Sequence, residues 1–136
     1  MANYIALCRS NYFAVRNPDD FRQFCQDWGL GCISKKDTDT AQELFGFVNN
    51  DGGIPAFRYD SKTNDFVEDT LFEHLAGHIQ PGWVAIVQEV GFEKLRYLVG
   101  YAVAVSCDGE LETVALSNIY ALAAEHAEFP ITPCEY

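Results

Sequence analysis

An alternating segment, Leu95–Val105, constrains the fold of this chain more than any other stretch. Every second residue in it is large, and the positions between them become small toward its end. The large set is Leu95, Tyr97, Val99, Tyr101, Val103 and Val105, and the small set is Gly100, Ala102 and Ala104. A repeat of two residues is that of a β-strand, whose side chains point alternately to opposite faces. We therefore expect a strand with a bulky face on the core and a flat face that another element can approach closely.

The turn after this strand predicts a hairpin. Asp108-Gly109 is a dipeptide typical of a two-residue type I′ turn. Such a turn sets the register Tyr101–Leu116 and Val103–Val114 on the large face, with Ala102–Ala115 and Ala104–Thr113 on the small face. Both faces stay consistent across the two strands, which favours the hairpin. A second strand candidate directly precedes Leu95, from Trp83 onward.

Three helices are predicted from their start and stop signals. Asn17 is an N-cap before a proline and two acids, an apolar stripe follows at helical spacing, and Gly29 ends the first helix. Asn64 is the cap of a second helix, which a Gln-Pro-Gly sequence ends. Ser117 is the cap of a third helix with Ile119, Leu122, Ala123 and His126 on one face.

Several short strands complete the expected fold. Residues 3–15 form either two short strands or one bent strand, and residues 31–34 form another. Residues 43–48 and 54–59 flank a cluster of Asn, Asp and Gly, which predicts a hairpin. Strands outnumber helices and join by tight turns. The expected class is therefore α+β, with a largely antiparallel sheet and about three helices in one compact domain over residues 1–136.

Acidic side chains dominate the charge of the chain. Twenty Asp and Glu residues against nine Lys and Arg give a formal net charge of −11. Such a field repels nucleic acid and anionic membranes and attracts basic surfaces. We therefore exclude direct nucleic-acid binding and a membrane partner. An apolar content of 49% with 14% aromatic residues indicates a packed core rather than disorder.

The cysteines indicate a reducing compartment. Their number is odd and their spacing irregular: Cys8, Cys25, Cys32, Cys107 and Cys134. The first residues show no secretory signal pattern, so we expect a cytoplasmic protein with reduced, mostly buried thiols. Cys25 and Cys32 lack the CxxC spacing of a redox pair. Burial of Cys25 beside Phe21 and Trp28 is the preferred interpretation.

Two histidines are the candidate metal ligands. His74 and His78 are four residues apart on the second predicted helix, with Asp69 or Glu73 as a third ligand. No HExxH motif accompanies them, and we prefer the interpretation that both line the inner edge of an amphipathic helix. We therefore expect no cofactor and no metal, and Gly-rich phosphate-binding motifs are absent from the sequence. Glu89, with the charged residues that follow it, is interpreted as part of a solvated bend.

The acids are the remaining functional signal. The residues of interest are Asp65, Glu68, Asp69 and Glu73 on the second predicted helix, and Asp108, Glu110 and Glu112 at the predicted hairpin tip. Carboxylates in a regular array on a rigid body imitate duplex phosphates and occupy a DNA-binding groove of another protein. Exposed aromatic residues such as Tyr59 or Tyr136 are candidate anchors for such a contact. Ordinary solubility is the competing explanation for the acids.

The chain resembles small proteins carried by phages, plasmids and integrative elements. The resemblance is carried by EVGFEKLRYLVGYAVAV (Glu89–Val105), the following DG turn, LSNIYALA around Ser117, and RSNYFAV (Arg9–Val15). Accessory proteins of such elements include antirestriction proteins and anti-CRISPR inhibitors. The resemblance implies binding to a host defence protein, and its motifs carry no catalytic residues.

These observations lead to one hypothesis and two alternatives. The leading hypothesis is an acidic, non-enzymatic inhibitor that binds a basic nucleic-acid-binding protein or ribonucleoprotein complex of a bacterial host and blocks its access to DNA or RNA. One alternative is a small metal-binding or hydrolytic enzyme that uses His74 and His78. The other is a structural accessory protein of a mobile element that dimerises through a free strand edge.

Overall fold

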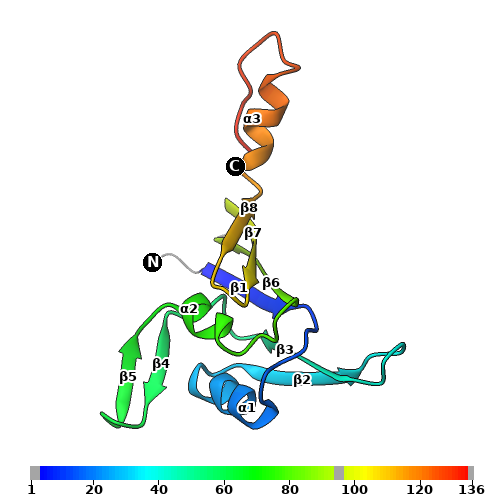
Figure 1. Ribbon diagram of the computed structural model, residues 1–136. Helices are drawn as coiled ribbons and strands as arrows, with labels where there is room; N and C mark the ends of the chain where they lie inside the picture. Colours follow the sequence, from blue (N-terminus) through cyan, green and yellow to red (C-terminus); the bar gives the residue numbers. More distant parts are fainter. Residues whose placement is uncertain (1–3, 94–96, 135–136) are drawn as a thin grey trace.

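The computed structural model describes residues 4–93 and 97–134, which form two antiparallel sheets and three helices (Figure 1). The strands are β1 (Tyr4–Ser10), β2 (Gly31–Lys36), β3 (Glu43–Asn49), β4 (Phe57–Asp60), β5 (Asp65–Glu68), β6 (Val84–Glu93), β7 (Tyr97–Ser106) and β8 (Leu111–Ala115). The helices are α1 (Pro18–Asp27), α2 (Leu71–Ala76) and α3 (Asn118–Ala124). The expected α+β class with a largely antiparallel sheet is confirmed. Leu95 and Arg96, at the start of the alternating segment, lie outside the described residues.

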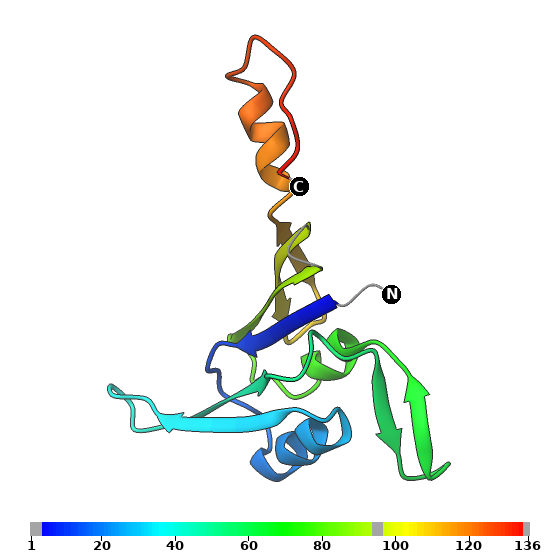
Figure 2. The ribbon, with the colours of Figure 1, turned by 180° about the vertical axis from the view of Figure 1, so that it is seen from behind.

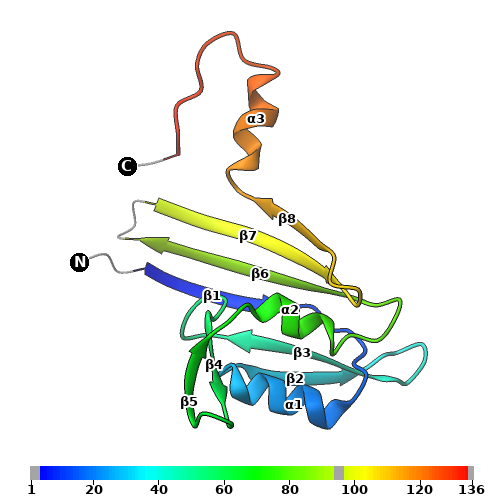
Figure 3. The ribbon, with the colours of Figure 1, turned by 60° about the vertical axis from the view of Figure 1, so that its left-hand side comes forward.

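The large sheet has the strand order β2-β3-β1-β6-β7-β8, and β4 pairs with β5 in a separate hairpin. Without that hairpin, the chain from β1 to β6 runs βαββαβ, which is the ferredoxin-like arrangement. β7 and β8 extend the sheet beyond β6. Figure 3 shows α1 and α2 on the same face of the sheet, so the core lies on that face. No helix in the described ranges has the length and apolar character needed to cross a bilayer.

Helix α1 forms where the sequence predicts it, because both of its ends are locally encoded. The side-chain oxygen of Asn17 accepts hydrogen bonds from the backbone N–H of Asp19 (3.0 Å) and Asp20 (3.1 Å), as an N-cap does. Pro18 lies in the first turn, where its missing N–H removes no helical hydrogen bond. Gly29 follows with a φ of 70°, the left-handed conformation that ends many helices.

The core between the helices and the sheet is rich in phenylalanine. Its large, fully buried side chains include Phe13, Phe21, Phe45, Phe47, Leu71, Leu75 and Ile79. Cys25 is buried in the same cluster as Phe21 and Trp28, as predicted. Burial raises the pKa of the Cys25 thiol, which keeps it protonated at neutral pH and makes it a poor nucleophile.

The N-terminal strands are longer and fewer than the sequence indicates. Residues 4–10 form the single strand β1, and Phe13 and Val15 then make isolated bridges to Phe45 and Ile79. The short strand expected at 31–34 extends to residue 36 as β2. These segments form one half of the large sheet.

The predicted hairpin between residues 43–48 and 54–59 is wrong. β3 instead pairs with β2 on one side and with β1 on the other, and its Phe45 and Phe47 are fully buried. Residues 49–56 form a loop, in which the Asn49 side-chain amide donates to the Gly53 carbonyl (2.8 Å). The turn-forming residues therefore shape a loop that leaves the sheet rather than a tight turn that stays in it.

The second helix is shorter than predicted. Residues 65–68 form β5, and α2 begins at Leu71 after Thr70 as N-cap. Asn64, the predicted cap, has a φ of 56° in the turn between β4 and β5. Phe66 and Val67 favour a strand through their aromatic and β-branched side chains. The helical stripe of acids expected at positions 65, 69 and 73 therefore does not form.

The β7–β8 hairpin forms, but its register differs by one residue from the prediction. Gly109 has a φ of 86°; its N–H donates to the Ser106 carbonyl (3.1 Å), while the Ser106 N–H donates to the Glu110 carbonyl (3.1 Å). These bonds define a three-residue loop that ends in a left-handed glycine. The observed pairs are Tyr101–Ala115, Ala102–Val114, Val103–Thr113 and Ala104–Glu112. Because a shift of one residue exchanges the faces, Val114 and Leu116 lie on the face opposite to the predicted one.

Glu89 is a buried carboxylate in the middle of β6, only 6% exposed. It accepts hydrogen bonds from the Tyr4 hydroxyl (2.8 Å) and from the Ile54 backbone N–H (2.5 Å). Gly53 lies so close that a Cβ at that position would overlap the carboxylate. The prediction of a solvated bend is wrong because β6 continues to Glu93. Glu89 therefore joins the 49–56 loop to the sheet.

This arrangement predicts an alkaline loss of stability. Burial and the nearby Glu89 raise the pKa values of Tyr4 and Tyr101 from the usual 10 to about 12. The folded state thus holds its phenolic protons more tightly than the unfolded state does, so stability declines as pH rises from 10 to 12. In an ultraviolet titration, Tyr4 and Tyr101 will ionise at a higher pH than an unperturbed tyrosine with a pKa of 10. In Glu89→Gln both titrate earlier, whereas in the exposed control Glu112→Gln neither moves; unchanged titration in Glu89→Gln contradicts this assignment.

Candidate interaction surface

The β4–β5 hairpin stands apart from the large sheet (Figures 1 and 2). It carries the exposed aromatic side chains Phe57 and Phe66. Its turn is locally encoded: the Asp60 carboxylate accepts from the Lys62 N–H (3.0 Å), and the Tyr59 hydroxyl donates to the Asn64 side chain. The strand register pairs Tyr59 with Phe66. Antiparallel partners project their side chains to the same face, so these two rings meet.

Three aromatic side chains form the centre of this face. Phe57 is 55% exposed and Phe66 is 67% exposed, although both are large and apolar. The Tyr59 and Phe66 rings pack edge to face with centroids 5.7 Å apart. Together with the end of α1, including Trp28 and Asp27, the three rings line a cavity of about 410 Å³. Rigid aromatic groups beside a cavity are typical of interface anchors.

Carboxylates lie at both ends of the hairpin. Glu68 is the partner of Phe57 and shares the face of the three rings, whereas Asp60 and Asp65 are partners at the turn and lie on the opposite face. Two acids opposite each other repel, so the hairpin tolerates an electrostatic cost at the turn. We call the hairpin residues Phe57, Tyr59, Phe66 and Glu68, together with Asp60 and Asp65 at the turn, the hairpin surface.

Asp69 has a different environment from the other acids of the predicted set. Its Oδ2 atom accepts from Arg58 Nε (2.7 Å) and contacts His74 Nε2 (2.7 Å), and its Oδ1 atom accepts from the Thr70 N–H (2.8 Å). The hydrogen bond from Arg58 is the main cause that lowers the Asp69 pKa to about 2. Asp69 therefore joins the hairpin to α2 and is occupied within the chain.

The remaining predicted acids are exposed but do not share one face. Glu73 lies on α2, while Asp108, Glu110 and Glu112 lie in the β7–β8 turn and on β8, at the edge of the large sheet. Of the predicted set, Asp65 and Glu68 both belong to β5, at its two ends and on opposite faces, and Asp60 is the cross-strand partner of Asp65.

The two candidate metal ligands do not converge. His74 contacts Asp69, whereas the ring of His78 packs on Phe24 with centroids 4.9 Å apart. Burial lowers the His78 pKa, which favours its neutral form. Across residues 4–93 and 97–134, no group of three His, Cys, Asp or Glu side chains has the arrangement of a metal site.

Sequence reasoning found part of the hairpin surface. Tyr59 was identified as an exposed aromatic anchor, while Tyr136 lies outside the described residues. Phe57 and Phe66 were missed because they were assigned to other elements. The available signal was the sequence of aromatic and aliphatic residues on either side of Ser61–Asn64, a run of turn-forming residues.

Removing the Asp69 charge will test its structural role. Asp69→Asn will lower the thermal midpoint at neutral pH, because Arg58 and His74 lose their shared carboxylate. The folded-state pKa of Asp69 is depressed from 3.8 to about 2, so its stabilisation is present above pH 3.8 and disappears as pH falls toward 2. The midpoints of wild type and variant will therefore converge in acid. The exposed control Glu68→Gln will match wild type throughout, and equal effects of the two changes contradict the assignment.

Comparison with known proteins gives no further assignment of this surface. No family model, curated protein or solved structure matches the chain. The functional argument therefore rests on the chemistry of the described residues.

Proposed function

We propose that this chain is a non-enzymatic binding protein that docks its hairpin surface on the basic, nucleic-acid-binding surface of another protein. The observation that carries the proposal is a group of three aromatic side chains, the exposed Phe57 and Phe66 with the half-buried Tyr59, bordered by carboxylates on an antiparallel hairpin. The target is a protein or ribonucleoprotein complex of bacterial host defence, and binding blocks its access to DNA or RNA.

The aromatic rings favour a basic partner. An Arg guanidinium or Lys ammonium is attracted to the face of an aromatic ring, and desolvation strengthens that attraction to about 2 kcal/mol. Glu68 lies on the same face as these rings, and Asp60 and Asp65 follow them at the turn, so a cation that binds Tyr59 or Phe66 has carboxylates at both ends of the hairpin. The surface thus offers apolar area and negative charge to the same side chain.

The charge of the whole chain supports the same class of partner. A formal charge of −11 accelerates the approach to a basic groove and disfavours acidic partners. Surfaces that bind nucleic acid are basic because they neutralise phosphates. The resemblance to proteins of phages and plasmids directs the proposal toward antirestriction or anti-CRISPR activity.

Charge reversal on the hairpin tests the electrostatic part of the proposal. Purified restriction enzymes and CRISPR effector complexes are incubated with the protein, and their DNA binding is followed by fluorescence anisotropy at low and high salt. Wild type will inhibit at least one of them, and less at high salt. Asp65→Lys/Glu68→Lys will lose inhibition at least tenfold while its thermal midpoint stays near that of wild type.

A matched control separates local charge from total charge. Asp39→Lys/Glu43→Lys makes the same change in net charge at exposed positions in the β2–β3 connection and at the start of β3. This control will retain inhibition. Equal loss in both variants contradicts a specific role of the hairpin surface, and the absence of inhibition across the panel contradicts the proposed target class.

Truncation of an aromatic anchor tests the apolar part. Phe66→Ala will weaken binding to the inhibited complex on the order of 30-fold, the effect typical of an interface hot spot. Phe129→Ala makes the same truncation at a side chain that is 80% exposed and lies outside the hairpin surface, and it serves as the control. Direct titration measures both affinities; a Phe66→Ala variant that binds like wild type excludes Phe66 as an anchor.

A further inference from the structure

The second face of the large sheet is apolar and uncovered. We call this the outer face: it is formed by the alternate residues of β1, β6, β7 and β8 that point away from α1 and α2. Across the four strands, the register aligns Leu7, Val90, Gly100 and Leu116 in one row. β6 is apolar on both sides, since exposed Ile86 and Val90 alternate with buried Ala85 and Val87. A strand that is apolar on both sides is typical of a sheet covered on both faces.

Helix α3 is exposed beside this face. Figures 1 and 2 show it beyond β8, away from α1 and α2. None of its residues is buried, and Ile119 and Leu122 are each 58% exposed. Asn118 fixes its start, because the Asn118 side chain accepts a hydrogen bond from the Ala115 N–H (2.5 Å). A helix of seven residues gains little stability on its own, so it needs a packing partner.

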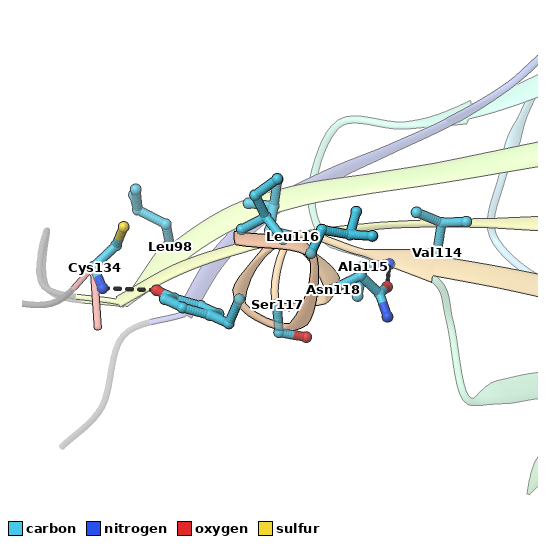
Figure 4. Close-up of a pocket in the computed structure, with 10 residues that line it drawn as sticks. Leu98, Val114, Ala115, Leu116, Ser117, Asn118 and Cys134 are labelled. Atoms are coloured by element: carbon cyan, nitrogen blue, oxygen red, sulfur yellow. Dashed lines mark hydrogen bonds between the residues drawn. The ribbon is translucent and has the colours of Figure 1, made fainter. Parts of the chain in front are cut away.

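A large apolar cavity opens where α3 meets the sheet. Its volume is about 550 Å³, and Leu98, Leu116, Ile119 and Leu122 are among its lining residues. Figure 4 shows Leu98, Val114 and Leu116 directed to the same side of the ribbon. The tail that returns along α3 is held by a hydrogen bond from the Cys134 N–H to the Tyr120 hydroxyl (2.7 Å). The cavity is therefore a defined receptor for apolar side chains.

We propose that the outer face and α3 bind a second copy of this chain, which forms a face-to-face homodimer. This proposal is independent of the proposed function because the hairpin surface is not part of the interface. The exposed aliphatic side chains involved are Ile5, Leu7, Ile86, Val90, Leu98, Val114, Leu116, Ile119 and Leu122, which are 41–67% exposed. Each partner of a standard interface contributes about 800 Å², and nine aliphatic side chains exposed to this extent present an apolar area of that order. The largest apolar patch of a typical monomer covers only about 300–600 Å².

The outer face is nearly neutral. This favours a second copy of the chain as its partner, rather than the basic protein proposed to bind the hairpin surface. Among the described residues of β1, β6, β7 and β8, this face carries one base, Arg9, and one acid, Glu112, although acids exceed bases twofold in the whole chain. Neither residue forms an ion pair within the described ranges. Arg9 lies on β1 and Glu112 on β8, at opposite sides of the face.

A twofold axis parallel to the strands matches these two charges. Such an axis places β1 of one copy over β8 of the other, because it reverses the order of strands across the interface. Arg9 then faces the row of Val114 of the second copy, two residues along β8 from Glu112. Two residues of a strand span about 7 Å, which an extended Arg side chain covers, and the pair occurs twice. The same axis places α3 beyond β8 on the β1 side of the second copy, where Ile5 and Leu7 are exposed. These aliphatic side chains fit the apolar cavity beside α3.

A dimer through the free strand edge of β8 is less favourable. The Ala115 N–H at that edge is already bonded to Asn118. Glu110 and Glu112 on this strand and turn would also approach the same acids of a second copy. Charged edges oppose strand pairing. We therefore assign the dimer contact to the face rather than the edge.

Light scattering and sedimentation across a concentration series test the proposal. Wild type will show a mass of twice 15.2 kDa and a thermal midpoint that rises with protein concentration. Val114→Asp will raise the dissociation constant at least tenfold. Leu111→Asp is the matched control, because Leu111 is exposed on the same strand but on the opposite face, and this variant will remain dimeric. A monomeric wild type, or a dimer that tolerates Val114→Asp, overturns the proposal.

Charge exchange tests the arrangement of the two copies. Arg9→Glu and Glu112→Arg will each weaken the dimer, because each places like charges opposite one another. The double variant Arg9→Glu/Glu112→Arg will restore it. Failure of the double variant to recover the wild-type dissociation constant overturns the proposed axis.

Discussion

The left-handed conformation of Gly109 determines what the C-terminal part of the chain exposes. It adds a third residue to the β7–β8 loop and thereby moves the register of β8 by one position. Thr113 and Ala115 take the core-side positions of β8, and the larger Val114 and Leu116 lie outside. Leu116 then covers Gly100 so closely that a Cβ there would be 2.8 Å from a Leu116 methyl carbon. The flat face of β7 thus accommodates a side chain of its own neighbouring strand, and α3 begins on the outer side of the sheet.

A second constraint, the buried carboxylate of Glu89, determines where the chain leaves the large sheet. Its hydrogen bonds to Tyr4 and Ile54 join the centre of β6 to the loop that leads into β4. Where the chain leaves β5, Asp69 accepts from Arg58 of β4 and contacts His74 of α2. The two segments that connect the hairpin to the rest of the chain are therefore held by charge-assisted hydrogen bonds, which are stronger than neutral ones. A surface held in this way loses little conformational freedom when it binds, and such preorganisation favours affinity.

The sequence predicts elements whose signals are local and misses those that depend on distant partners. α1 was predicted at both ends because Asn17 and Gly29 act within a few residues of the helix. The β7–β8 register was missed because an Asp-Gly pair fits both the two-residue and the three-residue loop, and only the backbone decides between them. β3 was assigned to the wrong partner because its buried aromatic residues need strands on both sides. The hairpin surface was found only in part, since its rings meet through the cross-strand pairing of Tyr59 with Phe66.

Most of the charge of the chain lies away from the apolar outer face, as the two proposed contacts require. A net charge of −11 on each copy opposes association, but repulsion between exposed charges is largely screened beyond about 8 Å at physiological ionic strength. The outer face carries one charge of each sign, so its burial brings few acids within that distance. A face-to-face dimer leaves both hairpins outside the interface. If both proposals hold, one dimer presents two hairpin surfaces to an extended basic groove, and avidity then gives tighter binding than either surface alone.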